Sequence, residues 1–136
     1  MVADQLHSAS IHLLRKLRRE DAASGLNAAR LSALSVIVFA GPITPGDLAA
    51  AEQVRPPTMT RIVDALVQHG LAEKKENAQD GRSTLIQATG LGKKLLLRGR
   101  DRRVRVLAER VGGLDSDDRD VLKRAAEILK RVIVAI

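Results

Sequence analysis

Two helix starts, each led by proline, lie close together in the middle of the chain and limit what it can fold into. Thr44 precedes Pro45, and Arg55 precedes the pair Pro56-Pro57. Proline carries no N–H and is tolerated only in the first turn of a helix, where that N–H would have no partner. The pattern therefore predicts a short helix, a tight turn and a second helix in close succession.

The second of these helices, expected over residues 56–69, has two contrasting faces. Helical spacing groups its apolar residues on one side: Met59, Ile62, Val63 and Leu66. The opposite side carries Pro57, Thr60, Arg61, Asp64 and Gln68. Gly70 suits the left-handed position that ends many helices. Two short helices joined in this way are typical of a helix-turn-helix.

The segments on either side complete the expected architecture. Residues 71–76 and 84–89 have no helical stripe and predict two short strands, joined by a polar loop with Asp80-Gly81 at its tip. Amphipathic or capped helices are expected near residues 3–20, after Asn27, after Thr89 and after Asp115. The order predicts a mainly α fold with a small β-hairpin wing, a winged helix-turn-helix plus a helical dimerisation region.

Composition excludes several function classes. The 136 residues include no Cys and one aromatic, Phe39, so thiol chemistry and base stacking on aromatic rings are ruled out. No nucleophile elbow, glycine-rich phosphate loop or pair of catalytic carboxylates stands at a recognisable spacing, and the histidines lack metal-ligand spacing. No apolar run is long enough to span a membrane. We expect no enzyme activity, cofactor or metal, and a cytoplasmic protein.

The net charge of +7 is unevenly distributed. Residues 93–110 hold eight basic and two acidic side chains, whereas residues 55–92 hold five basic and four acidic ones. We interpret the basic run Lys93, Lys94, Arg98, Arg100, Arg102, Arg103 and Arg105 as a solvated helix surface rather than a DNA track. It still adds to the field that steers DNA encounter.

The exposed start of the second proline-led helix has the chemistry of a DNA reader. An α-helix fits the major groove, where Arg can fork onto guanine acceptors and Thr can contact a base, a phosphate or a thymine methyl group. Pro57 offers only shape and apolar contact. The candidate DNA-binding residues here are Arg55, Pro57, Thr58, Thr60 and Arg61. For Asp64, two interpretations stay open: it orients Arg61, or it is a plain surface charge.

The hairpin tip is a second candidate reader. Arg82 has the side chain that the negative potential of the minor groove attracts, and Asp80 can hold an arginine by a forked ion pair. The alternative for Arg82 is a merely solubilising loop. The alternative hypothesis for the function of the whole chain is a winged-helix protein-interaction module that does not read DNA.

The last helix is apolar over too wide an arc for one core-facing stripe. Its apolar residues include Val121, Leu122, Ile128, Val132 and Ile133. We expect the terminal helices to join in a dimer interface.

Two blocks make the chain resemble the MarR (multiple-antibiotic-resistance regulator) family of winged helix-turn-helix regulators. The first is the stretch 58–66 followed by Gly70-Leu71, and the second is Asp80-Gly81-Arg82-Ser83 followed by the stretch 88–92. Arg55 and Ala88 depart from the usual family pattern, and the cysteine of the peroxide-sensing branch is missing.

The resemblance implies a homodimer whose first and last two helices form the dimer region. It implies a repressor that binds double-stranded, pseudo-palindromic operator DNA. It also implies release by a small, often aromatic or phenolic ligand, held between the dimer region and the DNA-binding lobe by residues of the first, second and fifth helices. We expect one domain, 1–136, with a DNA-binding lobe at 28–90 and the dimerisation region at 1–22 and 91–136.

Overall fold

The computed structural model describes residues 1–79, 81 and 83–136. Asp80 and Arg82, two of the candidate DNA contacts, lie outside the described residues. The elements in chain order are α1 (Val2–Leu17), the 3₁₀ helix η1 (Arg18–Ser24), α2 (Ala28–Ala40), α3 (Pro45–Ala51), α4 (Pro56–Gln68), β1 (Ala72–Glu76), β2 (Thr84–Ala88), α5 (Gly90–Gly112) and α6 (Ser116–Ala135).

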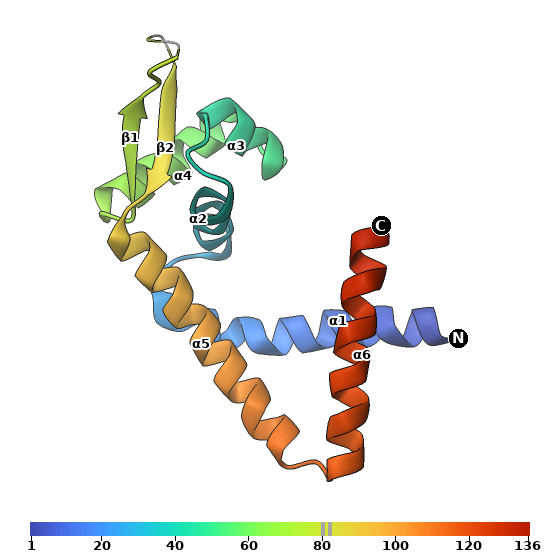
Figure 1. Cartoon of the computed structure of the whole chain (residues 1–136). Helices are drawn as coiled ribbons and strands as arrows, with labels where there is room; N and C mark the ends of the chain where they lie inside the picture. Colours follow the sequence, from blue (N-terminus) through green and yellow to red (C-terminus); the bar gives the residue numbers. More distant parts are fainter. Residues whose placement is uncertain (80, 82) are drawn as a thin grey trace.

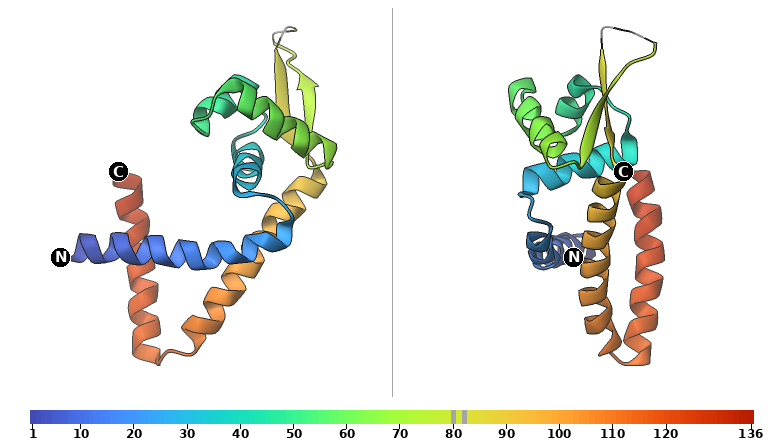
Figure 2. Two further views of the ribbon diagram at one scale, coloured as in Figure 1. Left: turned by 180° about the vertical axis from the view of Figure 1, so that it is seen from behind. Right: turned by 90° about the vertical axis from the view of Figure 1, so that its left-hand side faces the viewer.

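These elements form two parts (Figure 1). Helices α2, α3 and α4 gather beside the hairpin of β1 and β2, and we call this part the winged lobe. Helix α5 leads away from it, α6 diverges from α5 after a turn at Gly113, and α1 lies across them (Figures 1 and 2). We call α1, η1, α5 and α6 the helical frame.

Side-chain caps at the start of four helices confirm the predicted starts. Asn27, Thr44, Thr89 and Asp115 each accept a hydrogen bond from the backbone N–H three residues further on, at 2.8 to 3.1 Å. Such a bond satisfies one of the N–H groups that a helix start leaves unpaired. Short-range chemistry therefore sets these boundaries.

The hydrophobic core lies in the winged lobe. Leu34, Ile37, Leu48, Leu66 and Ile86 are at most 1% exposed, and they come from four of its elements. Helix α4 turns its predicted apolar face to this core, with Met59 and Val63 buried beside Leu66. The opposite face of α4 is left in solvent.

The hairpin is tied to the rest of the winged lobe by a bridge that the sequence did not predict. Strands β1 and β2 pair antiparallel, with Ala72 opposite Ala88 and Glu76 opposite Thr84. Ile43 then exchanges two backbone hydrogen bonds with Ile86, at 2.8 and 3.0 Å. Ile43 is a single paired residue and not a strand, so the sequence shows no alternating pattern that would predict this bridge.

The junction of α4, β1 and α5 is closely fitted. Gly70 has φ +72°, and the backbone N–H groups of Gly70 and Leu71 donate to carbonyls in the last turn of α4. The Thr89 hydroxyl donates to the Gly70 carbonyl at 2.6 Å. A Cβ on Gly92 would lie 2.1 Å from the Leu71 carbonyl oxygen, so only glycine fits there. The orientation of α4 is thereby fixed by both neighbours.

The end of the first helix differs from our expectation. We predicted a helix to about residue 20 and a break over 21–25. Instead α1 ends at Leu17, and a 3₁₀ helix continues to Ser24 before Gly25 turns with φ +75°. The Ser24 hydroxyl donates to the Asp21 carbonyl at 2.6 Å and accepts from the Leu26 N–H at 3.2 Å. These bonds stabilise the tighter winding.

No single helix in the described part of the chain is long and apolar enough to cross a membrane. The segments Val2–Ser24 and Ala28–Ala40 are together long and apolar enough to do so, but the chain bends by 89° between them. The second of them carries Leu34 and Ile37, which the core of the winged lobe buries.

Candidate nucleic-acid interface

The start of α4 is the centre of the candidate interface. Arg55 occupies the N-cap position with extended backbone, Pro56 and Pro57 form the first helical positions, and the Met59 N–H donates to the Arg55 carbonyl at 3.1 Å. This is the arrangement that the double proline predicts, since neither ring needs a hydrogen-bond partner.

Five of the seven predicted contacts lie together on this exposed end. Arg55, Pro57, Thr58, Thr60 and Arg61 are all exposed. Buried Met59, Val63 and Leu66 hold the helix from the other side. The arrangement presents cations, hydroxyls and a proline ring on one convex helical surface, the shape that a major groove accepts.

The partner of Asp64 is a residue that the sequence did not single out. Lys74 on β1 donates to the Asp64 carboxylate at 2.9 Å, and the two side chains are 48% and 58% exposed. Neither interpretation left open for Asp64 included this pair. An ion pair this exposed contributes only about 0–1 kcal/mol to stability. The pair neutralises a carboxylate beside the candidate DNA-binding surface.

Hydrogen bonds between Asn77 and Ser83 close the base of the hairpin loop. Asn77 donates its backbone N–H to the Ser83 carbonyl at 3.0 Å, and its side-chain amide to the Ser83 hydroxyl at 2.9 Å. The Gln79 N–H donates to the Asn77 side-chain oxygen at 3.1 Å. The roles of Asp80 and Arg82 remain predictions.

The basic run on α5 divides into two groups. Lys93, Lys94, Arg98, Arg100 and Arg105 are exposed, as a solvated surface requires. For Arg102 and Arg103 that interpretation is wrong, because both turn back to the 3₁₀ helix. Each arginine is 82 positions away from its partner in the sequence, so no local sequence pattern predicts the contact.

These two arginines hold η1 against α5 within the helical frame, just before the chain enters the winged lobe at α2. The Arg102 Nε donates to the Glu20 carbonyl at 3.3 Å. The Arg103 guanidinium donates to the Asp21 carboxylate at 2.5 Å, with both side chains less than a third exposed. Gly99 is buried against them, and a Cβ there would lie at ordinary contact distances of 3.5 and 3.6 Å from their guanidinium nitrogens.

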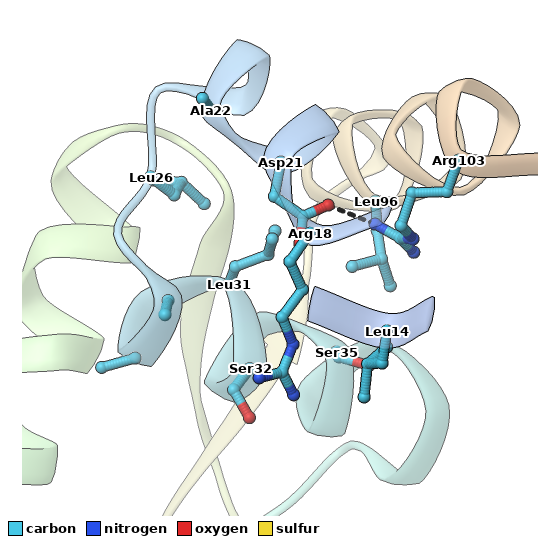
Figure 3. A pocket seen from close by; sticks show the side chains of 12 residues that line it. Leu14, Arg18, Asp21, Ala22, Leu26, Leu31, Ser32, Ser35, Leu96 and Arg103 are labelled. Carbon is cyan, nitrogen blue, oxygen red and sulfur yellow. Dashed lines mark hydrogen bonds and ion pairs between the residues drawn. The ribbon is translucent and has the colours of Figure 1, made fainter. Parts of the chain in front are cut away.

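A cavity of about 690 Å³ opens beside this ion pair, among α1, η1, α2 and α5. Leu14, Leu31 and Leu96 give it an apolar part, and Arg18, Ser32 and Ser35 give it a polar part. Figure 3 shows the Arg18 side chain extending from η1 into the cavity, with the Asp21–Arg103 pair at its edge. These are the elements from which we expected a ligand pocket. Helix α3 and the hairpin do not line it.

No group of three or more His, Asp or Glu side chains suited to a metal ion occurs among the described residues.

Comparison with known proteins links this geometry to one group of regulators. The sequence model of the MarR family matches residues 26–84. An uncharacterized HTH-type transcriptional regulator of Mycobacterium leprae, ML2140, is 36% identical over 132 residues, which cover 97% of this chain and 92% of that protein.

Solved structures share the fold over nearly the full length. The transcriptional regulator Tm0710 of Thermotoga maritima superimposes with a TM-score of 0.88 at 21% identity, covering 98% of this chain and 94% of that one. A variant of MepR from S. aureus, bound to an oligodeoxyribonucleotide, has a TM-score of 0.74 at 19% identity, covering 100% and 99%. At these identities the likeness concerns the fold alone.

Proposed function

This chain belongs to the MarR family of transcriptional regulators, and from that membership we propose that it is a homodimeric, ligand-released repressor that reads a pseudo-palindromic operator. As a family member it is a DNA-binding regulator and not an enzyme. The observation that carries the proposal is the exposed end of α4, with Arg61 and its neighbours held outward by a helix whose other face is buried.

In the proposed complex the α4 helices of two protomers enter successive major grooves, about 34 Å or 10 base pairs apart. Arg55, Pro57, Thr58, Thr60 and Arg61 supply the contacts there. Asp80 and Arg82 are proposed to act at the hairpin tip, with Arg82 in the flanking minor groove. The fold shared with MepR, whose structure contains an oligodeoxyribonucleotide, supports DNA binding by a chain of this fold.

The helical frame is the proposed dimerisation region. Helices α1 and α6 contain no buried residue. Large apolar side chains on α6 remain 40–67% exposed: Val121, Leu122, Ile128, Val132 and Ile133. A second copy of the chain would cover these surfaces, which water otherwise contacts at a cost. We assign DNA reading to residues 28–90 and dimerisation to residues 1–22 and 91–136.

The cavity between the two parts is the proposed site of a small aromatic or phenolic ligand. Its apolar side chains suit a ring, and Arg18, Ser32 and Ser35 suit a polar substituent. A ligand shifts the equilibrium only if it binds one conformation better than another. Since the cavity lies where α2 meets α1 and α5, its filling would change the spacing of the two α4 helices. We place this action in the cytoplasm, with the operator DNA.

Selection of bound DNA from a random double-stranded library tests the proposal. We expect enrichment of an inverted repeat with half-sites about 10 base pairs apart. Repeating the selection with a panel of small aromatic acids should reduce recovery for at least one compound. Enrichment of no sequence, at either of two salt concentrations, would instead support a winged-helix module that binds proteins.

A further inference from the structure

Two features remove a backbone donor and a hydroxyl donor from the surface around Pro57 and Thr60 at the start of α4. The first is the double proline. A helix start usually offers several free backbone N–H groups, which can hold phosphate. In α4 the first two positions are Pro56 and Pro57, so Thr58 is the first residue of the helix with an N–H. The ring of Pro57 is exposed in their place.

The second feature is the hydroxyl of Thr60, which already has a partner. Thr60 Oγ1 donates to the Pro56 carbonyl at 3.0 Å, one turn back along the helix. Bonding of this kind holds a threonine side chain to its own backbone. To donate to a base or a phosphate, the hydroxyl must first leave that carbonyl. The methyl group of Thr60, which is attached to the same Cβ, can contact a base without breaking this hydrogen bond.

Pro57 and Thr60 are also neighbours. Residues three apart lie next to each other on a helix surface. Both are exposed, and the exposed Arg61 lies four residues after Pro57, which is also a neighbouring spacing on a helix. An apolar ring and a methyl group therefore stand side by side, next to a guanidinium.

We propose that Pro57 and Thr60 together select a thymine by contact with its C5-methyl group in the major groove, beside the base pair that Arg61 meets. The inference rests on the proposed DNA reading by α4 and adds which base this part of the helix prefers. Thymine alone among the four bases presents a methyl group in that groove, and small apolar groups are its usual partners.

The test uses the full-length protein and the operator obtained by library selection. Each conserved thymine is replaced in turn by deoxyuridine, which differs from it only by the absent methyl group. At one thymine in each half-site we expect binding to weaken about fourfold, the effect of exposing one methylene-sized group. Deoxyuridine outside the conserved positions serves as the DNA control.

Two variants distinguish the methyl group from the hydroxyl. Thr60→Ser keeps the hydroxyl and removes the methyl group, so its preference for thymine over uracil should fall clearly below fourfold, because only Pro57 still contacts the thymine methyl group. Thr60→Val keeps a methyl group in a branched side chain and removes the hydroxyl, so it should retain the fourfold preference. Thermal unfolding of both variants checks that each remains folded.

Three results would overturn the inference. One is a Thr60→Val variant that loses binding while Thr60→Ser keeps the thymine preference, which would make the hydroxyl the contact. Another is an operator whose conserved thymines all tolerate uracil in the wild-type protein, with DNA reading itself intact. The third is enrichment of no sequence by the wild-type protein, which would remove the proposed function along with the inference.

Discussion

The winged lobe and the helical frame differ in how far one chain can bury its own apolar surface. In the winged lobe, residues from α2, α3, α4 and both strands meet in a core whose centre is almost inaccessible to water. In the helical frame, α1 and α6 bury no residue, although α6 has a wide apolar face. The lobe thus buries a core of its own, whereas the apolar face of α6 stays exposed in the single chain. Changes in each part should therefore have effects of a different kind.

The largest expected effect comes from a charge on the apolar face of α6. Leu122 is 45% exposed in the single chain and would be covered in the dimer. Leu122→Asp would leave an unpaired charge in the interface, at a cost of about 3–5 kcal/mol, or more than 100-fold in the dimer dissociation constant. Sedimentation equilibrium measures this constant.

Lys123 provides the matched control for that change. It is exposed and, by helical spacing, lies on the opposite face of α6. Lys123→Asp should leave the dimer intact. If both variants remain dimeric, the apolar face of α6 is not the interface, and the contrast between lobe and frame needs another explanation.

A substitution that creates an empty space in the core of the winged lobe should lower the free energy of unfolding and should not dissociate the dimer. Leu34 is fully buried, and Leu34→Ala should reduce the free energy of unfolding by about 2–5 kcal/mol. Urea unfolding followed by circular dichroism measures the loss. Leu91, which is 54% exposed, is the control, and its replacement by alanine should cost far less. Equal losses would contradict the placement of the core.

Removal of Arg61 should affect DNA binding and little else. We expect Arg61→Ala to weaken binding to the selected operator by about 1–3 kcal/mol and to relax preference at one position of each half-site. Because Arg61 is exposed, urea unfolding should be unchanged. Gel shifts against operator and random DNA measure both affinities. If both affinities are unchanged, Arg61 is not part of the interface.

The ion pair that holds η1 against α5 within the helical frame should have a smaller effect. Asp21→Asn weakens the ion pair with Arg103, and we expect a loss of about 1 kcal/mol or less. Hydrogen exchange should nevertheless increase in η1 more than in α4, because Arg103 holds η1 against α5. The control is Asp101→Asn, since Asp101 and Arg100 lie 3.8 Å apart and are about two-thirds exposed. Similar exchange in η1 for both variants would show that the pair does not hold the junction.

The smallest effect is expected at the exposed start of the basic run. If Lys93 and Lys94 belong to a solvated surface, replacing both by alanine should barely alter the slope of log affinity against log salt. Each lysine that contacts a phosphate would instead reduce that slope by about 0.9. A clear reduction would make this end of α5 part of the DNA interface.

The local features of the fold could be predicted from the sequence. Thr44, Asn27, Thr89 and Asp115 each cap a helix through a bond that spans three residues. The apolar spacing of α4 identified which side faces the core, and so which side is exposed. For the candidate interface, this was enough to bring five of the seven predicted residues together.

Contacts between distant segments could not be predicted. Ile43 pairs with Ile86, Asp64 with Lys74, and Asp21 with Arg103. In each case the side chain or backbone group has many possible partners in the sequence, and no periodic signal favours one. The same holds for the cavity, whose wall comes from four separate elements.

The sequence by itself determined where helices begin, which faces are apolar and which residues stand on the exposed start of α4. Hydrogen bonds within one turn and the period of the helix decide these features, and both are local. Only the tertiary structure decided that Arg102 and Arg103 turn back to η1 and that Lys74 neutralises Asp64. A charged or polar group takes the partner that folding brings within reach, and packing of the whole chain determines that partner.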